Sequence, residues 1–210
     1  MRARPVTPDG LVALVAARID ELADKHDRVR LAVDGAPGSD PAALADALVD
    51  PLRVAGHAVV RASAWDFLRP ASLRLEQGRE DPDAFYDDWL DVGGLDRELL
   101  TPLGPGGSGR YLPTLWNMRT DRATRAPYAQ GPPRSVLVLD GTLLLGRWLQ
   151  FELTVHLSLS AAALRRRIGA DELWTLPAYE RYAEDAAPLL TADVAVRMDD
   201  PRHPAVVREA

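Results

Sequence analysis

The chain has 210 residues, a length that favours one domain with a substantial hydrophobic core. Hydrophobic residues make up 47% of it, which excludes a disordered chain, and its net charge of -6 disfavours a general nucleic-acid binder. The chain has no Cys, and its four His show no metal-ligand spacing, so we expect no disulfide and no metal site formed by these residues.

Nothing in the sequence suggests a membrane protein. No apolar run approaches the ~20 residues that a transmembrane helix needs. The first residues also lack the apolar core of a signal peptide. We therefore expect a cytoplasmic protein with no membrane or nucleic-acid partner. Its richness in Ala, Arg, Asp and Pro is typical of a high-GC bacterial genome.

Helices and strands are predicted to alternate in the first third of the chain. Thr7 is a suitable N-cap for a helix that begins at Pro8 and carries an apolar stripe. The elements expected next are a buried strand over 28–33, a helix over 42–55 and a second strand over 58–62. This order predicts an α/β fold with a parallel sheet flanked by helices.

The middle of the chain, residues 66–134, is predicted to be an irregular insertion rich in Pro, Gly, Arg and Asp, with short helices over 83–90 and 95–100. The elements expected after it are strands over 135–141, 153–159 and 192–198, and helices over 161–168 and 177–190. We expect a single domain over 1–210. Its expected parts are an N-terminal helix in 1–27, a core of 28–65 with 135–200, and a substrate-side insertion over 66–134.

Residues 33–42, VDGAPGSDPA, have the strand, turn and helix order of a phosphate-binding loop. Such a loop has the pattern G-x-x-G-x-G-K-[ST] in one of its forms. The first two glycines of that pattern are present. The candidate nucleotide-binding residues are Gly35, Gly38, Ser39 and Asp40.

The second half of the loop departs from the pattern. Asp40 stands where the last Gly belongs, Pro41 where the Lys belongs, and Ala42 where the Ser or Thr belongs. Asp followed by Pro is typical of an N-cap and the first residue of a helix. The loop is thus either a degenerate nucleotide site or a capped helix start after a tight turn.

Several further motifs follow the loop in order along the chain. They are Arg61-Ala62-Ser63-x-x-Asp66-Phe67-x-Arg69-Pro70, Gly78-Arg79-x-x-Pro82-x-x-Phe85-Tyr86, Pro102-Leu103-Gly104-Pro105-Gly106-Gly107 with Arg110-Tyr111, Arg119-Thr120-Asp121, Val138-Leu139-Asp140-Gly141 and Tyr179-x-x-Tyr182. The series resembles the uridine kinase family of P-loop kinases, in its actinobacterial form, from about residue 30 to about residue 196. The resemblance implies a three-layer P-loop NTPase-like core, a lid, and Mg²⁺-dependent phosphoryl transfer from ATP to the 5′-hydroxyl of uridine or cytidine.

The residues that carry this chemistry in the family are partly replaced. The family's loop Lys neutralises phosphate charge and its Ser or Thr ligates Mg²⁺, and neither Pro41 nor Ala42 can do so. The family places an Asp after the second strand to accept the proton of the nucleoside hydroxyl, and Trp65 stands there. Asp66, one residue further, is either a replacement base or a loop N-cap.

Other family positions are retained. Asp140 ends an apolar strand where the family has an acid near the metal-bound water, and the alternative is a solvated strand end. The family's lid begins with basic residues that clamp phosphates, and the alternative here is a solvated helix face. These lid candidates are Arg165, Arg166 and Arg167. The candidates on the nucleoside side are Asp91, Tyr111 and Arg119.

Three functions follow from these observations. The first is a kinase-like protein that has lost efficient phosphoryl transfer and keeps a nucleoside or nucleotide pocket. The second is an active small-molecule kinase with a rebuilt phosphate site, in which the lid arginines replace the Lys. The third is a non-catalytic interaction protein on the same fold.

Overall fold

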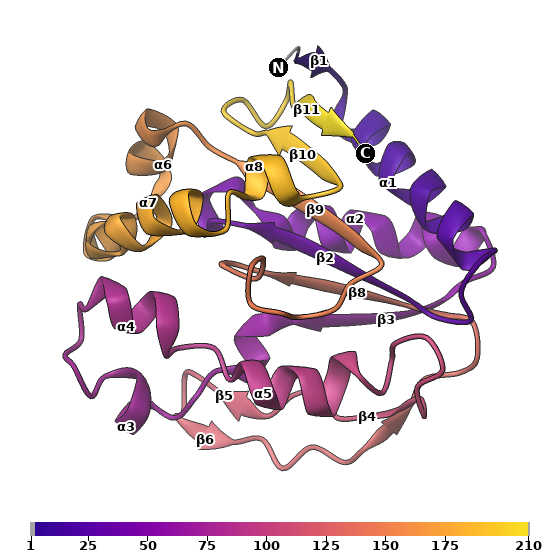
Figure 1. Ribbon diagram of the computed structural model, residues 1–210, viewed down its shortest axis with the longest axis horizontal. Coiled ribbons are helices and arrows are strands. Elements are labelled where there is room, and N and C mark those ends of the chain that lie inside the picture. The colour runs from indigo at the N-terminus through magenta and orange to yellow at the C-terminus, as the bar shows by residue number, and fades with distance from the viewer. Residues whose placement is uncertain (1–2, 210) are drawn as a thin grey trace.

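A seven-stranded sheet forms the centre of the computed structural model, which describes residues 3–209 (Figure 1). Its strand order is β1-β11-β10-β9-β2-β8-β3, and the five strands from β10 to β3 are parallel. The strands are β1 (Arg4–Pro5), β2 (Val29–Gly35), β3 (Ala58–Ser63), β8 (Ser135–Gly141), β9 (Leu153–Ser158), β10 (Val194–Arg197) and β11 (Ala205–Glu209). The expected parallel α/β fold is confirmed.

Two helices cover one face of the sheet (Figure 1). Because successive residues of a strand point to opposite faces, each central strand contributes side chains to a core on both sides of the sheet. Helix α1 (Pro8–Ala23) begins after the predicted Thr7 cap, whose side chain accepts from the Gly10 N–H. Helix α2 (Pro41–Val54) follows β2 after a short loop. Both helices pack on Leu31 and Val33 of β2, while the neighbouring Ala32 belongs to the core on the other face.

The insertion covers part of the opposite face. The core there joins Leu99, Leu100 and Leu103 to Leu137 and Leu139 of β8. The short helices of this region are η2 (Ala64–Phe67), α3 (Ala71–Arg74), α4 (Pro82–Asp87), α5 (Val92–Leu95) and the π-helical η3 (Asp96–Leu100). Two small antiparallel pairs complete it, β4 (Arg110–Tyr111) with β7 (Ala129–Gln130) and β5 (Trp116–Asn117) with β6 (Arg122–Ala123).

The segment between β9 and β10 corrects one prediction. It contains α6 (Ala161–Arg167), η4 (Ala170–Thr175), α7 (Leu176–Asp185) and α8 (Pro188–Thr191). The single helix expected over 177–190 is therefore wrong. Ala187 adopts a left-handed conformation with φ of 44°, which ends the helical path, and Pro188 starts a separate turn.

The sheet also extends beyond the predicted strands. β11 pairs antiparallel with β10, and β1 pairs with β11 at the sheet's edge. In residues 3–209 no helix combines the length and the apolar character that a membrane crossing requires.

Candidate functional site

The loop between β2 and α2 is closed by its own hydrogen bonds. Pro37–Ser39 form a single 3₁₀ turn, η1. The Ser39 N–H donates to the Ala36 carbonyl at 2.8 Å, and the Asp40 N–H donates to the Pro37 carbonyl at 3.0 Å. The Ser39 hydroxyl donates to the same Ala36 carbonyl at 2.7 Å. These donors, which a phosphate-binding loop directs at its ligand, are used inside the turn.

Asp40 caps helix α2, as the sequence predicts. Its carboxylate accepts from the Ala43 N–H at 3.1 Å, and Pro41, the first helical residue, has no N–H. Asp40 itself lies in the left-handed region, with φ of 57°. The carboxylate thus stands at the positive end of the helix, where an anion would otherwise bind.

Both glycines of the loop are sites of close approach. A Cβ at Gly35 would lie 2.4 Å from the Ser39 Oγ, and a Cβ at Gly38 would lie 2.9 Å from the Cβ of Arg167. The Arg167 guanidinium donates to the Gly38 carbonyl at 3.2 Å. It also donates to the carbonyls of Met198 and Asp199, at 2.8 and 2.6 Å. Arg167 therefore joins the loop to the end of β10.

The other two lid candidates have no such contacts. Arg165 and Arg166 are exposed on the last turn of α6. Within residues 3–209, no hydrogen bond or ion pair joins either of them to the loop. Their predicted phosphate contacts stay a prediction, whereas the two Nη groups of Arg167 already donate to three carbonyls.

Asp140 lies at the end of β8 and forms an ion pair with the side chain of Arg61. Its side chain is only 3% exposed, and Oδ1 lies 2.5 Å from Nη1 of Arg61. The Ser63 hydroxyl donates to Oδ2 at 3.1 Å. The Nε of Arg61 also donates to Asp46 on α2, at 2.8 Å. A guanidinium is thus held between two carboxylates.

Asp66 lies beside this pair, in the 3₁₀ turn η2. Ser63, not Asp66, caps that turn, by accepting from the Trp65 N–H at 3.4 Å. Partial burial raises the pKa of the Asp66 carboxyl, and the negative charge of Asp140 raises it further. A hydrogen bond with Thr114 and the charge of Arg61 oppose this rise in the pKa. The structure thus couples the two candidate catalytic acids through their charges.

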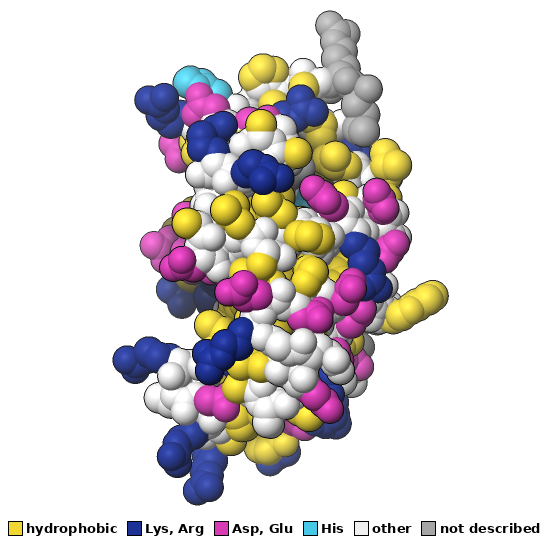
Figure 2. All heavy atoms as spheres, turned by 90° about the vertical axis from the view of Figure 1, so that its left-hand side faces the viewer, with side chains coloured by type: hydrophobic (Ala, Val, Ile, Leu, Met, Phe, Trp, Pro, Cys, Tyr) yellow, Lys and Arg dark blue, Asp and Glu magenta, His cyan; other side chains and the backbone are white. Residues whose placement is uncertain are grey.

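An aromatic cleft begins at the loop and runs between the insertion and the segment after α6. It has a volume of about 380 Å³, and Pro37 of the loop is part of its wall. The ring of Phe85 makes edge contacts with Trp89 and Trp174, at centroid distances of 5.1 and 5.6 Å. The aromatic side chains that line the cleft are Trp65, Phe85, Trp89, Trp174 and Tyr179. Figure 2 views the end of the molecule that carries α4 and α7, where hydrophobic side chains lie between charged ones.

The three nucleoside-side candidates lie outside the lining of this cleft. Asp91 caps α5 by accepting from the Gly94 N–H at 2.8 Å. Tyr111 packs half-buried against the core under the insertion, and burial raises the pKa of its hydroxyl. Arg119 is exposed between β5 and β6. The structure does not bring these residues together, and their nucleoside contacts stay a prediction.

Sequence reasoning missed a buried polar cluster below the loop. Asp34, fully buried at the end of β2, accepts from Nδ1 of His156, from the Tyr182 hydroxyl and from the Leu144 N–H. The three distances are 2.7, 2.8 and 3.0 Å. The only sign of this cluster in the sequence is Asp34 itself, an acidic residue at the end of an apolar strand. Within residues 3–209 no group of three or more His, Asp and Glu side chains is arranged to hold a metal ion.

Comparison with solved structures shows what this arrangement is similar to. A protein described as a possible uridine kinase from Bacillus stearothermophilus matches 87% of the chain and 98% of its own length, with a TM-score of 0.66 and 22% identity. A candidate fructose transport system kinase from Silicibacter sp. TM1040 matches 86% and 98%, with a TM-score of 0.65 and 21% identity. The chain has a P-loop kinase fold.

A more distant similarity agrees with this fold. The protein YGR205w aligns over 90% of the chain and 92% of its own length, with a TM-score of 0.55 and 12% identity. Neither a protein-family model nor a curated protein sequence matches the chain. At these identities the shared property is the kinase fold.

Proposed function

We propose that this protein is a nucleoside-kinase-like protein that has lost efficient ATP-dependent phosphoryl transfer and keeps a cleft for a nucleoside or nucleotide. The closed loop is the observation that carries this proposal. Its turn uses the N–H groups of Ser39 and Asp40, and the Asp40 carboxylate binds the helix N-terminus. A triphosphate would have to displace that carboxylate, and it would meet like charge.

The size of the loss follows from the missing contacts. A loop Lys and a loop hydroxyl would each supply a charge-assisted contact, worth about 1.5–3 kcal/mol. Pro41 and Ala42 supply neither. Losing both weakens the binding of Mg²⁺·ATP by roughly 3–6 kcal/mol, or roughly 10²–10⁴-fold.

The residues around Asp140 support the same proposal, because they do not fit Mg²⁺. The carboxylate that a kinase turns toward the metal-bound water is paired here with Arg61. A second cation at this place would be repelled by the guanidinium. This arrangement does not support phosphoryl transfer from Mg²⁺·ATP.

The aromatic cleft supports ligand binding. Its Trp, Phe and Tyr side chains offer flat faces and edges for a base, and its volume of about 380 Å³ lies within the usual range for small-molecule sites. The absence of Cys from the sequence agrees with the cytoplasmic location that we propose for the protein.

One observation favours the alternative of an active kinase with a rebuilt site. A base needs a pKa near the working pH, and the pKa of Asp66 is raised toward that range. If Asp66 acts as the base, the protein turns over a nucleoside and Asp66→Ala abolishes the turnover. That result would overturn the proposed loss of activity.

Calorimetry on the natural protein and two triple variants tests the proposal. The natural protein should bind uridine or cytidine but bind Mg²⁺·ATP weakly or not at all. Asp40→Gly with Pro41→Lys and Ala42→Thr restores the loop chemistry, so Mg²⁺·ATP binding should strengthen by at least about tenfold. In the matched control Pro41→Met replaces Pro41→Lys, which leaves out only the new charge.

Two results of this calorimetry would contradict the proposal. Tight Mg²⁺·ATP binding by the natural protein would show that the closed loop does not exclude the nucleotide. If no nucleoside or nucleotide binds to the natural protein, the retained cleft is wrong, and a non-catalytic interaction protein becomes the better interpretation.

A further inference from the structure

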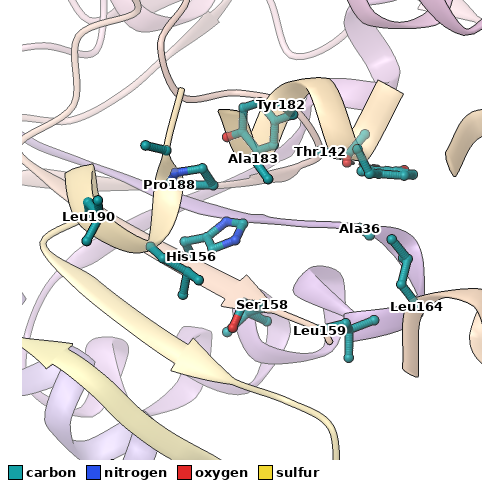
Figure 3. Close-up of a pocket in the computed structure, with 14 residues that line it drawn as sticks. Ala36, Thr142, His156, Ser158, Leu159, Leu164, Tyr182, Ala183, Pro188 and Leu190 are labelled. Carbon is teal, nitrogen blue, oxygen red and sulfur yellow. Dashed lines mark hydrogen bonds between the residues drawn. The ribbon is translucent and has the colours of Figure 1, made fainter. Parts of the chain in front are cut away.

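A second cavity lies on the other side of Tyr179, between the sheet and helices α7 and α8. Its volume is about 380 Å³, and Tyr179 is the one residue of its lining that also lines the aromatic cleft. Most of its wall is apolar, formed by Ala36, Leu157, Leu159, Leu164, Leu189 and Leu190. Figure 3 shows His156 of β9 in the middle of this lining, with Tyr182 and Ala183 of α7 across from it.

His156 is held so that one ring nitrogen is left for the cavity. Its Nδ1 lies 2.7 Å from Oδ2 of Asp34, a carboxylate with no exposed surface. The side chain of His156 is only 10% exposed. Its Nε2 has no hydrogen-bond partner in residues 3–209, and it points away from Asp34 because the two ring nitrogens lie on opposite sides of the imidazole.

The surroundings of Asp34 fix which nitrogen carries the proton. Its oxygens also accept from the Tyr182 hydroxyl and the Leu144 N–H, so the carboxylate acts only as an acceptor. Nδ1 of His156 must then be the donor, and in the neutral ring Nε2 is a hydrogen-bond acceptor. Tyr182 is itself fixed, since its hydroxyl oxygen accepts from the Leu145 N–H at 2.9 Å.

Two other hydroxyls of the cavity wall already donate within the protein. The Ser158 hydroxyl donates to the Val196 carbonyl at 3.1 Å. The Thr142 hydroxyl lies 3.4 Å from that of Tyr179. The cavity therefore combines an apolar wall with one oriented acceptor.

We propose that this cavity binds an uncharged, mainly apolar molecule whose hydroxyl group donates a hydrogen bond to Nε2 of His156. An anion would be repelled by the buried charge of Asp34. An ammonium ion would lose its hydration against an apolar wall and find a single neutral acceptor. A neutral hydroxyl loses less hydration free energy than a charged group when it enters the cavity, and a hydrogen bond to Nε2 would fix the orientation of the ligand.

An NMR titration with small aromatic probes tests this site. In protein labelled with ¹⁵N at His, phenol should shift the Nε2 resonance of His156. Toluene, which has the same ring with a methyl group in place of the hydroxyl, should bind at least about fivefold more weakly. Benzylammonium and benzoate serve as the charged comparisons. Either of them binding more tightly than phenol would overturn the proposed ligand class.

Two variants separate the acceptor from the cavity. In His156→Asn the side-chain amide can still donate to Asp34 while the second ring nitrogen is gone, so the preference for phenol over toluene should be lost. Ala183→Phe fills the cavity and should abolish the binding of both probes, and Glu184→Phe, at the neighbouring exposed position outside the lining, should leave it unchanged. Phenol binding that survives Ala183→Phe would place the ligand elsewhere and refute the proposal.

Discussion

The guanidinium of Arg61 lies 2.5 Å from the carboxylate of Asp140, at the C-terminal ends of the parallel strands β3 and β8. β3 and β8 place the two residues there, since Ser63 is the direct partner of Asp140 in the parallel register. Asp140 is nearly fully buried, so its charge depends on this partner.

Arg61→Met should therefore destabilise the protein strongly. It leaves the buried Asp140 carboxylate without its cation, which we expect to lower the free energy of unfolding by about 3–5 kcal/mol. Asp46→Ala removes only the outer contact of Arg61, with a carboxylate that is 70% exposed, and should change stability by about 0–1 kcal/mol. Urea unfolding measures both variants, and equal losses would show that Asp140 does not depend on the pair.

The backbone of Asp40 gives a ranking of three substitutions. Asp40→Asn keeps a capping oxygen and tolerates the left-handed conformation, so it should change stability least. Asp40→Gly loses the cap, but glycine adopts the left-handed backbone conformation without steric cost. Asp40→Ala loses the cap and keeps the unfavourable φ of 57°, so it should cost the most, about 1–2 kcal/mol. Thermal unfolding gives the order, and an Ala variant more stable than the Gly variant would contradict it.

Tyr182→Phe tests the cluster around Asp34. The hydroxyl donates to Asp34 and accepts from the Leu145 N–H, and both partners are buried. Removing it should cost about 1–3 kcal/mol, because the buried Leu145 N–H loses its acceptor and Asp34 loses one of its three donors. Tyr179→Phe is the matched control, since within residues 3–209 that hydroxyl has one hydrogen bond, which it accepts from Thr142 at 3.4 Å. We expect a smaller loss for it in urea unfolding, and the reverse order would mean that the cluster contributes little.

Asp66 and Asp121 should respond to pH in opposite directions. The pKa of Asp66 is raised in the folded protein above 3.8, so the folded state holds this proton more tightly and stability falls as pH rises through the raised value. Asp66→Asn removes that loss and should raise the Tm relative to the natural protein at pH 7, with no gain at low pH.

Asp121 provides the opposite sign. Hydrogen bonds from the Ala71 N–H and from Trp116 lower its pKa below 3.8, so its stabilising effect is lost as pH falls through the lowered value. Asp121→Asn should lower the Tm at pH 7 and have less effect in acid. Parallel pH profiles for the two Asn variants would contradict both assignments.

The sequence predicts the five parallel strands of the sheet, because those strands are continuous apolar runs and the helices between them have clear caps. It predicts the Asp40 cap for the same reason, since capping is a local interaction. It does not predict β11, which follows a short turn and pairs at an edge of the sheet. The break at Ala187 is also missed, because a left-handed Ala has no sequence signal.

The missed part of the site depends on contacts between distant residues. Asp34 and His156 are 122 positions apart in the sequence, and the parallel register of β2 with β9 alone makes them neighbours. Arg61 and Asp140, 79 positions apart, meet in the same way. A sequence read alone identifies such acids as candidates but does not show which cation or ring each of them faces.

Three of the five tryptophans, Trp65, Trp89 and Trp174, line the aromatic cleft. Of the others, Trp148 is 94% exposed, so we expect its emission to be that of a tryptophan in bulk solvent. An occupant that displaces water from the cleft would therefore move the intrinsic fluorescence of the protein toward the blue, without any added dye. The same side chains that form the wall of the cleft thus make its filling visible, and unlabelled protein can be screened directly against collections of small molecules.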